Sequence, residues 1–402
     1  MLLLYQKKVI ITTANEYDLM VIYMKKFISF LLALTICLSA STVCFALEEN
    51  AQIEDFSKSS ILICADTGDI IYEKNAYEHL SPASVTKIMS VLLVLEAIES
   101  GKISLEDEVS ASESAVEMGG SQIWLEVGEK MSVNDLFKAV VVASANDACT
   151  ALGEYIAGSP QAFVTMMNEK AEQLGLKNTN FENCTGLDDT VTNHYSCAYD
   201  LAIIAKEVLK YDLIYDYTTV WLDYLRGGKT ELNNTNKLIN KYNGITGLKT
   251  GTTSKAGFCV CATATQNGMT LIAVVLGAKT SDERFQSASN LLDYGFANYE
   301  VIAPEIDINQ ITSVKVRNGV EKEIIPVYNQ TDKLMIKKGN GDITYEYKTE
   351  EEVKAPVEEN QTLGEICIYS NGALIKSVKL YSSKEIMKIS FNYIFKEMLR
   401  NI

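Results

Sequence analysis

The spacing of apolar residues changes several times along the chain, and each change predicts a different kind of element. Two short apolar runs, 60–65 and 70–73, flank the sequence Asp-Thr-Gly-Asp, which is typical of a β-hairpin with a glycine in its turn. From Ser84 the apolar residues recur at helical spacing as far as Gly101. We therefore expect a buried helix that carries Ser84 in its first turn.

The next part of the chain is mostly helical in its spacing and ends in two strands. The expected helices are 133–156 with a break at 144–146, 159–174, 196–209 and 281–294. Strands at 257–264 and 270–277 are joined through Asn267-Gly268, a strong hairpin signal. Because strands, helices and strands follow one another without βαβ alternation, the sequence predicts an α+β domain, in which helices pack on an antiparallel sheet.

Beyond residue 304 the pattern changes to short alternating runs separated by turn residues. These runs, within 310–380, predict a small all-β domain of the sandwich type, which we interpret as a spacer or an interaction platform. The last segment, 382–402, has an apolar face and several Lys and Arg residues, and is too polar to span a bilayer. It is typical of an amphipathic helix that lies on a membrane surface, although such a helix can also pack on its own domain.

The first 46 residues carry the pattern of a signal peptide. Met24-Lys25-Lys26 is a basic start, 27–38 is apolar, and small residues precede a cleavage site after Ala46. The apolar stretch is short for a membrane span, so cleavage is favoured over an uncleaved anchor. We therefore expect an exported protein on the extracytoplasmic face of the bacterial membrane, divided into 1–46 (upstream residues and signal), 47–303 (catalytic), 304–381 (all-β) and 382–402 (anchoring helix).

Composition narrows the function classes. A formal charge of −16 over 402 residues argues against binding to nucleic-acid phosphates. Of the nine cysteines, seven remain after the signal, an odd number without any CxxC pair, so we expect buried thiols rather than a disulfide framework. The only two histidines, His79 and His194, lack ligand spacing, and neither a metal nor another cofactor is expected.

The first chemical motif is Ser84-Val-Thr-Lys87 at the head of the buried helix. Ser84 and Lys87 lie three residues apart and therefore share a helix face. A serine hydroxyl needs a base before it can attack, and a lysine can be that base only when it is uncharged. Burial and a second nearby cation, for which Lys249 is the candidate, would lower the pKa of Lys87 toward that state.

The second and third motifs supply the remaining polar groups. Ser144-Ala-Asn146 lies at the helix break, where Ser144 can relay a proton and Asn146 can hold Lys87 and a substrate amide, although both could simply cap the next helix. Lys249-Thr250-Gly251 precedes the 257–277 hairpin, so we place it on a strand whose edge can pair with an extended peptide. In this interpretation Gly251 lets the substrate approach closely.

Two further residues complete the candidate site. Arg284, near Lys249 in the predicted sheet and helix layout, could grip a terminal carboxylate with two parallel hydrogen bonds, or could be an ordinary surface arginine. The backbone N–H groups of Ser84 and Thr252 could together form an oxyanion hole.

With these motifs in place, the chain resembles the low-molecular-mass penicillin-binding proteins that act as serine D-alanyl-D-alanine carboxypeptidases. The resemblance extends from about residue 59 to 299 and includes the segments 80–89, 119–123, 143–147, 167–171 and 247–251. It implies a β-lactamase/transpeptidase-like catalytic domain, a peptidoglycan stem pentapeptide as substrate, and β-lactam antibiotics as covalent inhibitors.

The resemblance also implies a role for each motif. Ser84 would be the acylated nucleophile and Lys87 its general base, with Ser144 and Asn146 as the second motif. The third motif would be Lys249, Thr250 and Gly251, and Arg284 would recognise the terminal carboxylate. Thr252 stands where some members of the family have histidine, which leaves its backbone role unchanged.

Two other functions share part of this pattern. A class A β-lactamase has the same three motifs but also needs a glutamate that activates the deacylating water, and no Glu-x-x-Leu-Asn segment occurs between Ser144 and Lys249. A catalytically silent wall-binding protein would have no reason to keep every reactive group. The carboxypeptidase is therefore the preferred hypothesis.

Overall fold

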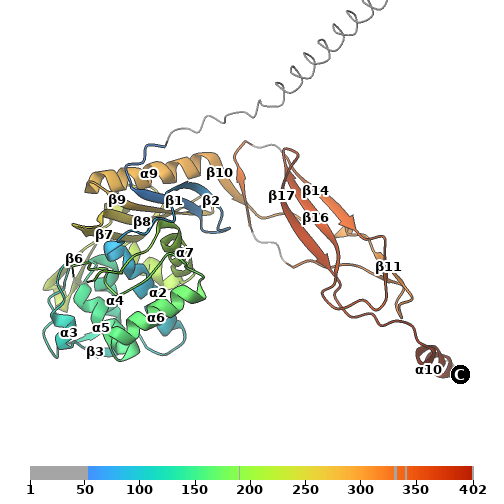
Figure 1. The fold of residues 1–402 in the computed structure, drawn as a ribbon, viewed down its shortest axis with the longest axis horizontal. Helices are drawn as coiled ribbons and strands as arrows, with labels where there is room; N and C mark the ends of the chain where they lie inside the picture. The colour runs from blue at the N-terminus through green and yellow to red at the C-terminus, as the bar shows by residue number, and fades with distance from the viewer. Residues whose placement is uncertain (1–52, 190, 330–332, 340–341, 401–402) are drawn as a thin grey trace, which may run out of the picture. The chain divides into compact units, whose positions relative to one another are not determined.

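The structure is a computed structural model that describes residues 53–189, 191–329, 333–339 and 342–400. The predicted signal peptide, residues 1–46, lies outside this part of the chain. The described residues form an antiparallel sheet with helices on both faces, followed by a separate set of β-strands (Figure 1). The predicted α+β fold with a C-terminal all-β domain is confirmed.

The central sheet has five strands in the order β2-β1-β9-β8-β7. All of its neighbouring strands run antiparallel. Its strands are β1 (Ser59–Cys64), β2 (Ile70–Lys74), β7 (Ile245–Thr253), β8 (Gly257–Gln266) and β9 (Met269–Ala278). Asn267 and Gly268 both have positive φ in the β8–β9 turn, as a tight hairpin turn requires. Strand β7, which carries the third motif, is an edge strand, so one side of its backbone is available to a partner.

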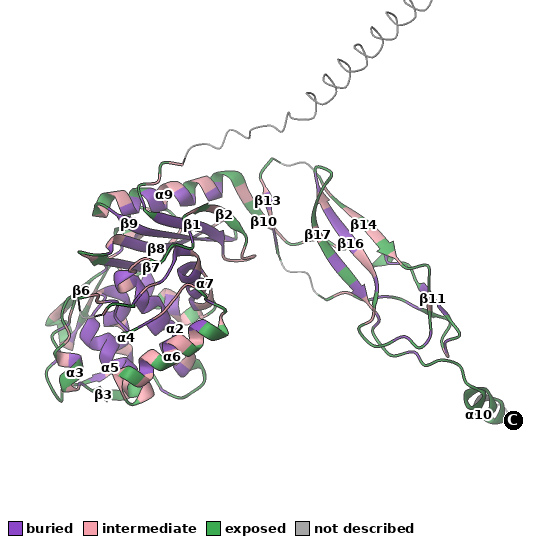
Figure 2. Cartoon of the chain, viewed as in Figure 1, coloured by how far each residue is buried: buried purple, intermediate pink, exposed green. Residues whose placement is uncertain are grey.

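Helices cover both faces of this sheet. Helix α9 (Ser281–Asn298) packs on one face through β8 and β9, and α7 (Ala198–Val208) packs on the other face (Figure 1). Helix α2 (Lys87–Glu99) contacts α4 (Val133–Val142), α5 (Asn146–Ala157) and α6 (Pro160–Gln173). Two short helices lie further out: α3 (Glu113–Val116) packs on α5, and α8 (Tyr215–Thr218) packs on α4. Residues of α2 from Lys87 to Leu95 are all buried, so this helix is enclosed rather than half exposed (Figure 2).

Short strands and turns complete the catalytic body. The two-stranded pairs are β3 (Glu108–Ser110) with β4 (Lys130–Ser132) and β5 (Leu222–Leu225) with β6 (Thr230–Asn233). The 3-10 turns are η1 (Ala83–Thr86), η2 (Asp212–Ile214), η3 (Arg226–Gly228) and η4 (Lys237–Asn240). The expected break in the 133–156 helix is present between α4 and α5, because Ser144 there has a φ of 63°.

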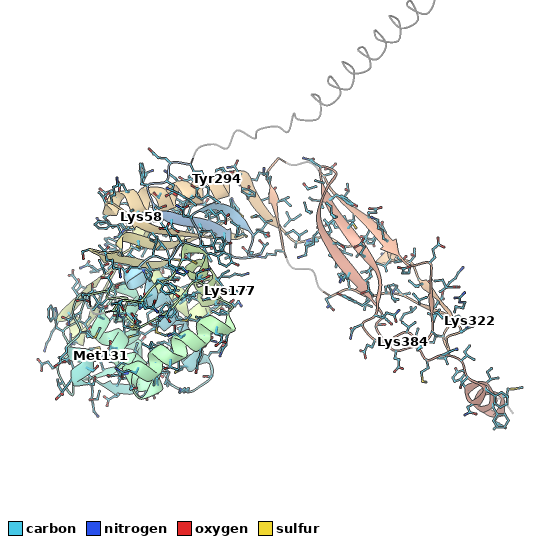
Figure 3. All side chains as sticks on the ribbon, viewed as in Figure 1. Lys58, Met131, Lys177, Tyr294, Lys322 and Lys384 are labelled. Atoms are coloured by element: carbon cyan, nitrogen blue, oxygen red, sulfur yellow. The ribbon has the colours of Figure 1, made fainter. Side chains whose placement is uncertain are left out.

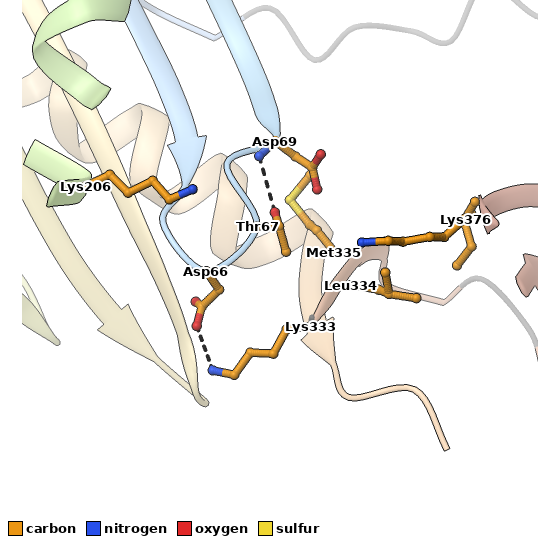
Figure 4. Close-up of a pocket in the computed structure, with 9 residues that line it drawn as sticks. Asp66, Thr67, Asp69, Lys206, Lys333, Leu334, Met335 and Lys376 are labelled. Atoms are coloured by element: carbon orange, nitrogen blue, oxygen red, sulfur yellow. Dashed lines mark hydrogen bonds and ion pairs between the residues drawn. The ribbon is translucent and has the colours of Figure 1, made fainter. Parts of the chain in front are cut away.

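The described residues of the C-terminal part up to residue 381 form strands and one 3-10 turn. Two three-stranded sheets, β12-β11-β15 and β14-β16-β17, have separate hydrophobic clusters, and β10 pairs with β13. The strands and connecting turn are β10 (Tyr299–Ile302), η5 (Ile308–Gln310), β11 (Val314–Arg317), β12 (Glu323–Ile324), β13 (Leu334–Lys337), β14 (Ile343–Thr349), β15 (Glu352–Lys354), β16 (Thr362–Ser370) and β17 (Ala373–Tyr381). An ion pair of 2.6 Å joins Asp66, in the β1–β2 turn, to Lys333 (Figure 4).

The terminal helix is shorter than the sequence predicted. Helix α10 spans Phe391–Arg400, and the expected start at Ser382 is wrong. Residues before it belong to the β domain, because Ile386 is fully buried in one hydrophobic cluster and pairs with Val357. Lys384 lies on that domain as well, in an ion pair with Glu321 (Figure 3). The predicted helix thus extended over residues that belong to the β domain.

The thiols behave as predicted. All seven cysteines of the described residues are free and buried. No group of three or more His, Cys, Asp or Glu side chains in this part of the chain is arranged to hold a metal ion.

Candidate active site

Ser84 lies in the 3-10 turn η1, immediately before the first residue of α2. Pro82 precedes the turn, and Ala83 has a positive φ of 49°, an uncommon conformation for a residue with a side chain. The serine is half-buried while the flanking Ala83 and Val85 are buried. The turn therefore presents the Ser84 side chain at the surface of an otherwise enclosed helix start.

Lys87 is the hub of the hydrogen bonds around this serine. Its fully buried Nζ donates to Ser84 Oγ at 3.1 Å, to Asn146 Oδ1 at 2.5 Å and to the Thr185 carbonyl at 2.9 Å. Burial lowers the pKa of Lys87 to about 8, while the nearby Cys149, Cys184 and Asp147 act in the opposite direction. At that pKa, about one-tenth of the amine is uncharged at pH 7.

The helix break between α4 and α5 positions the second motif. Asn146 is the first residue of α5, where its Nδ2 donates to the Gly119 carbonyl at 2.6 Å while its Oδ1 accepts from Lys87. Ser144 is buried, and its Oγ has no hydrogen-bond partner among the described residues. A buried hydroxyl without a partner is costly in a folded protein, which points to a role for Ser144 with a bound substrate.

The third motif lies on β7 and is electrostatically coupled to the first. The Nζ of Lys249 is buried. Within the described residues it donates only to the Thr250 carbonyl, at 3.1 Å. The pKa of Lys249 lies well below its usual value, chiefly because of burial and then because of the positive charges of Lys87 and Arg284. These positive charges oppose the charge of Lys249, so its protonated form is disfavoured in the site without substrate.

Gly251 has a packing role that the sequence pattern did not predict. A Cβ at this position would lie 2.8 Å from the Pro82 carbonyl oxygen and from the Ser84 nitrogen. The turn that carries the serine therefore approaches Gly251 closely. The missing side chain lets the edge strand pack directly on the backbone of Ser84.

Arg284 lies under the end of β7 and already uses much of its guanidinium. Nη1 donates to the carbonyls of Gly251 and Cys259, at 3.1 and 3.2 Å, and to Thr252 Oγ1 at 3.0 Å. Burial lowers the pKa of Arg284 to about 10, and its Nε has no partner within the described part of the protein. Its position fits a residue that holds Gly251 and Thr252 in place and adds positive potential below the strand edge.

The structure adds one segment that the sequence analysis did not assign to the site. Residues 183–187 pass beneath the first motif, and the Thr185 carbonyl is one of the three acceptors of Lys87. Asn183 Oδ1 accepts from the backbone N–H groups of Thr185 and Gly186, at 3.1 and 2.7 Å. A Cβ on Gly186, whose φ is 82°, would lie 1.8 Å from the Ala83 carbonyl oxygen. The turn-forming residues Asn, Thr and Gly were the available signal.

A second unassigned residue ties the two sides of the site together. Asp188 Oδ2 accepts from Ser81 Oγ at 2.8 Å, just before the nucleophile turn, and from Thr253 Oγ1 at 2.6 Å, at the end of β7. Together with Gly251, this carboxylate fixes the distance between the serine turn and the strand edge.

The fold and this cluster define a serine acyl-transfer enzyme, in which a buried lysine lies in hydrogen-bond contact with the serine. A hydroxyl at a helix start, a buried amine of lowered pKa one turn along, and a lysine-bearing edge strand are brought together by segments far apart in the sequence.

Comparison with known proteins agrees with this class and gives the family. The model of the D-alanyl-D-alanine carboxypeptidase family Peptidase_S11 matches residues 46–280, and that of the penicillin-binding protein 5 C-terminal domain matches residues 307–388. The chain belongs to the D-alanyl-D-alanine carboxypeptidase family of low-molecular-mass penicillin-binding proteins, and is a serine hydrolase of this type.

Individual relatives match between 61% and 92% of the chain. The D-alanyl-D-alanine carboxypeptidase DacF of Bacillus subtilis (strain 168) is 41% identical over 377 residues, which are 92% of this chain and 96% of DacF. Penicillin-binding protein 5 of Haemophilus influenzae has a similar structure, with a TM-score of 0.76 and 32% identity over 83% of this chain and 98% of that one. Penicillin-binding protein D2 of Listeria monocytogenes in its ampicillin-bound form matches 61% of this chain and 99% of its own, with a TM-score of 0.56 and 29% identity.

Proposed function

We propose that Ser84 is the nucleophile that attacks the carbonyl of the penultimate D-alanine in a peptidoglycan stem pentapeptide. Neutral Lys87 takes the Ser84 proton as the Oγ–carbonyl bond forms, since its Nζ lies 3.1 Å from that oxygen. The tetrahedral oxyanion is held by the backbone N–H groups of Ser84 and Thr252.

The proton then has to reach the leaving amine. In this proposal Ser144 Oγ, which lacks another partner in the described structure, carries it from Lys87 to the nitrogen of the terminal D-alanine. That D-alanine departs and leaves an ester on Ser84. Water hydrolyses the ester, with Lys87 again accepting a proton, and the tetrapeptide is released. A β-lactam carbonyl follows the same first step, and its leaving nitrogen stays tethered.

The terminal carboxylate of the substrate is assigned to the β7 side of the site. The pKa of Lys249 is low mainly because burial and other cations disfavour its charge, and a carboxylate within hydrogen-bond distance would restore that charge. Thr250, whose Oγ1 bonds Thr235 at 2.7 Å, would add a hydroxyl, while Arg284 supplies positive potential from behind. Recognition in this proposal is therefore coupled to protonation of Lys249.

The observation that carries the proposal is the bond from the fully buried, low-pKa Lys87 to Ser84. Its test is the release of free D-alanine from a peptide ending in D-alanyl-D-alanine, measured for the wild-type protein and for Ser84→Ala. We expect the wild type to release one D-alanine per peptide over many turnovers, and the variant to release none above background. Rapid turnover of a β-lactam without D-alanine release would instead support a β-lactamase.

We also propose that the protein works outside the cytoplasm on the membrane surface. None of the described helices combines the length and the apolar content that a bilayer crossing requires. Helix α10, however, exposes large apolar side chains at its surface (Figure 2): Phe391, Ile394, Phe395, Met398 and Leu399. Burying these side chains at the boundary between lipid headgroups and acyl chains would hold the enzyme beside its substrate.

A further inference from the structure

Trp124 is an exposed aromatic residue in an unusual backbone conformation. Its side chain is 76% exposed, and its φ of 57° lies in the left-handed region that bulky residues rarely adopt. The neighbours on either side, Ile123 and Leu125, are buried. Exposure of one apolar residue is ordinary, but a strained backbone that holds an indole in water adds nothing to packing.

The backbone around Trp124 is fixed by two buried or partly buried charged groups. The carboxylate of Asp147 accepts from the N–H groups of Ile123 and Leu125, both at 3.1 Å for its Oδ2. Arg226 donates to the Ile123 carbonyl at 2.9 Å and approaches the Trp124 carbonyl at 3.4 Å. The orientation of Trp124 is thus set from both sides of the peptide.

Both charged groups are connected to the walls of the active site. Asp147 directly follows Asn146, whose N–H donates to the Ser121 carbonyl at 2.7 Å in the same loop. Arg226 lies in the η3 turn that joins β5 to β6, and this hairpin leads to Thr235, the partner of Thr250. The loop that carries Trp124 therefore begins beside Asn146 and is joined to the β5–β6 hairpin further along, at Ile123 and Glu129.

Arg226 locks this junction. Its Nε and Nη2 bond the two oxygens of Glu129, at 2.7 and 3.0 Å, and Glu129 closes the loop that contains Trp124. Such a two-bond contact between guanidinium and carboxylate is rigid as well as strong. The loop that carries Trp124 is consequently held in one conformation before substrate binds. A preformed binding surface of this kind reduces the entropic cost of association.

From this geometry we propose that Trp124 forms a binding platform for the acyl-donor arm of the substrate, namely the aliphatic chain of the residue that precedes D-alanyl-D-alanine. The inference rests on the proposed function. In that proposal the carboxylate end of the substrate binds at Lys249 and Thr250. The acyl-donor end then leaves the site on the Asn146 side, where the loop that carries Trp124 begins. A large, rigid indole face suits a flexible methylene chain, which has no polar group to satisfy.

The test compares substrates with and without that arm. Values of kcat/KM are measured with Nα,Nε-diacetyl-L-lysyl-D-alanyl-D-alanine and with N-acetyl-D-alanyl-D-alanine for the wild type, Trp124→Ala and Trp124→Phe. We expect Trp124→Ala to lose about tenfold on the long substrate and less than about twofold on the short one, and Trp124→Phe to keep most of the activity. Tyr155 is also an exposed aromatic residue, and it lies near the C-terminal end of α5, away from Asn146. The control variant Tyr155→Ala should change neither value.

A parallel readout separates this inference from the proposed function. The same variants are acylated with a penicillin that has a long side chain and with 6-aminopenicillanic acid, which has none. Selective loss with the long side chain supports the platform even if the wild type releases no D-alanine, a result that would refute only the carboxypeptidase reaction. Equal losses on the long and short members of either pair, or no loss at all, would overturn the role of Trp124.

Discussion

At the scale of single residues, the chemistry depends on removing charge from a lysine. Lys87 is fully buried, and its amine contacts one amide oxygen and one carbonyl. These acceptors stabilise the charged amine less than bulk water does. Desolvation therefore lowers its pKa to about 8, close to the pH at which a base works best. A second buried lysine, Lys249, adds repulsion that a bound carboxylate can relieve.

The pH dependence of acylation should report this lysine. Protonated Lys87 cannot accept the Ser84 proton. At saturating penicillin the bound carboxylate already keeps Lys249 protonated, so the first-order rate constant for acylation should rise about tenfold per pH unit below the Lys87 pKa of about 8 and level off above it. Stopped-flow measurements from pH 6 to 10 would show this, with circular dichroism at each pH as the control for folding. A rate that is flat or falls with increasing pH over this range would contradict the role of Lys87.

At the scale of elements, the site is held by a segment with no reactive group of its own. Residues 183–187 supply the Thr185 carbonyl to Lys87, and Asn183 fixes the shape of this segment through its side chain. Its Nδ2 also donates to the Leu187 carbonyl at 2.7 Å. The position of the catalytic amine thus depends on one asparagine that does not touch it.

Replacing Asn183 should therefore weaken both folding and catalysis. Asn183→Ala leaves the N–H groups of Thr185 and Gly186 without their acceptor, which should lower the free energy of unfolding by about 1–3 kcal/mol. We expect penicillin acylation to slow about tenfold as the Thr185 carbonyl shifts. Asn183→Asp keeps the accepting oxygen and loses only the donor to Leu187, so its effects should be smaller. Thermal denaturation and acylation kinetics are the measurements, and an aspartate variant worse than alanine would contradict this account.

Sequence reasoning worked where local pattern and chemistry coincide. The helix break at Ser144, the β8–β9 hairpin and the helix start at Ser84 each follow from residues within a few positions of one another. Contacts between distant segments could not be predicted in this way. The packing of Gly251 on the Ser84 turn and the carbonyl of Thr185 depend on how the sheet meets α2, which no spacing encodes.

The C-terminal segment shows the opposite limit. A helical period fitted residues from 382 onward, yet Ile386 is used by the β domain, because burial in an existing hydrophobic cluster outweighs a local helical pattern. The helical pattern therefore holds only from Phe391, where α10 exposes its apolar side chains.

At the scale of the whole molecule, the boundary between the β domain and helix α10 decides how the membrane proposal is tested. Deleting residues 391–402 removes α10 and leaves Ile386 in place, so we expect a folded, active enzyme that moves from the membrane to the soluble fraction. Deleting 382–402 also removes Ile386, and should lower the unfolding temperature of the β domain. Fractionation and calorimetry distinguish the two effects. Unchanged membrane association after the shorter deletion would contradict a role for α10 in anchoring.

The central claim is that acyl transfer takes place on Ser84, in the cluster formed by Lys87 and the β7 edge. The most direct measurement is peptide mapping by mass spectrometry after reaction with a penicillin. The account predicts one penicilloyl group per wild-type molecule, on the peptide that contains Ser84, and none on Ser84→Ala with its fold intact. An adduct on any other residue, or undiminished labelling of the alanine variant, would contradict it.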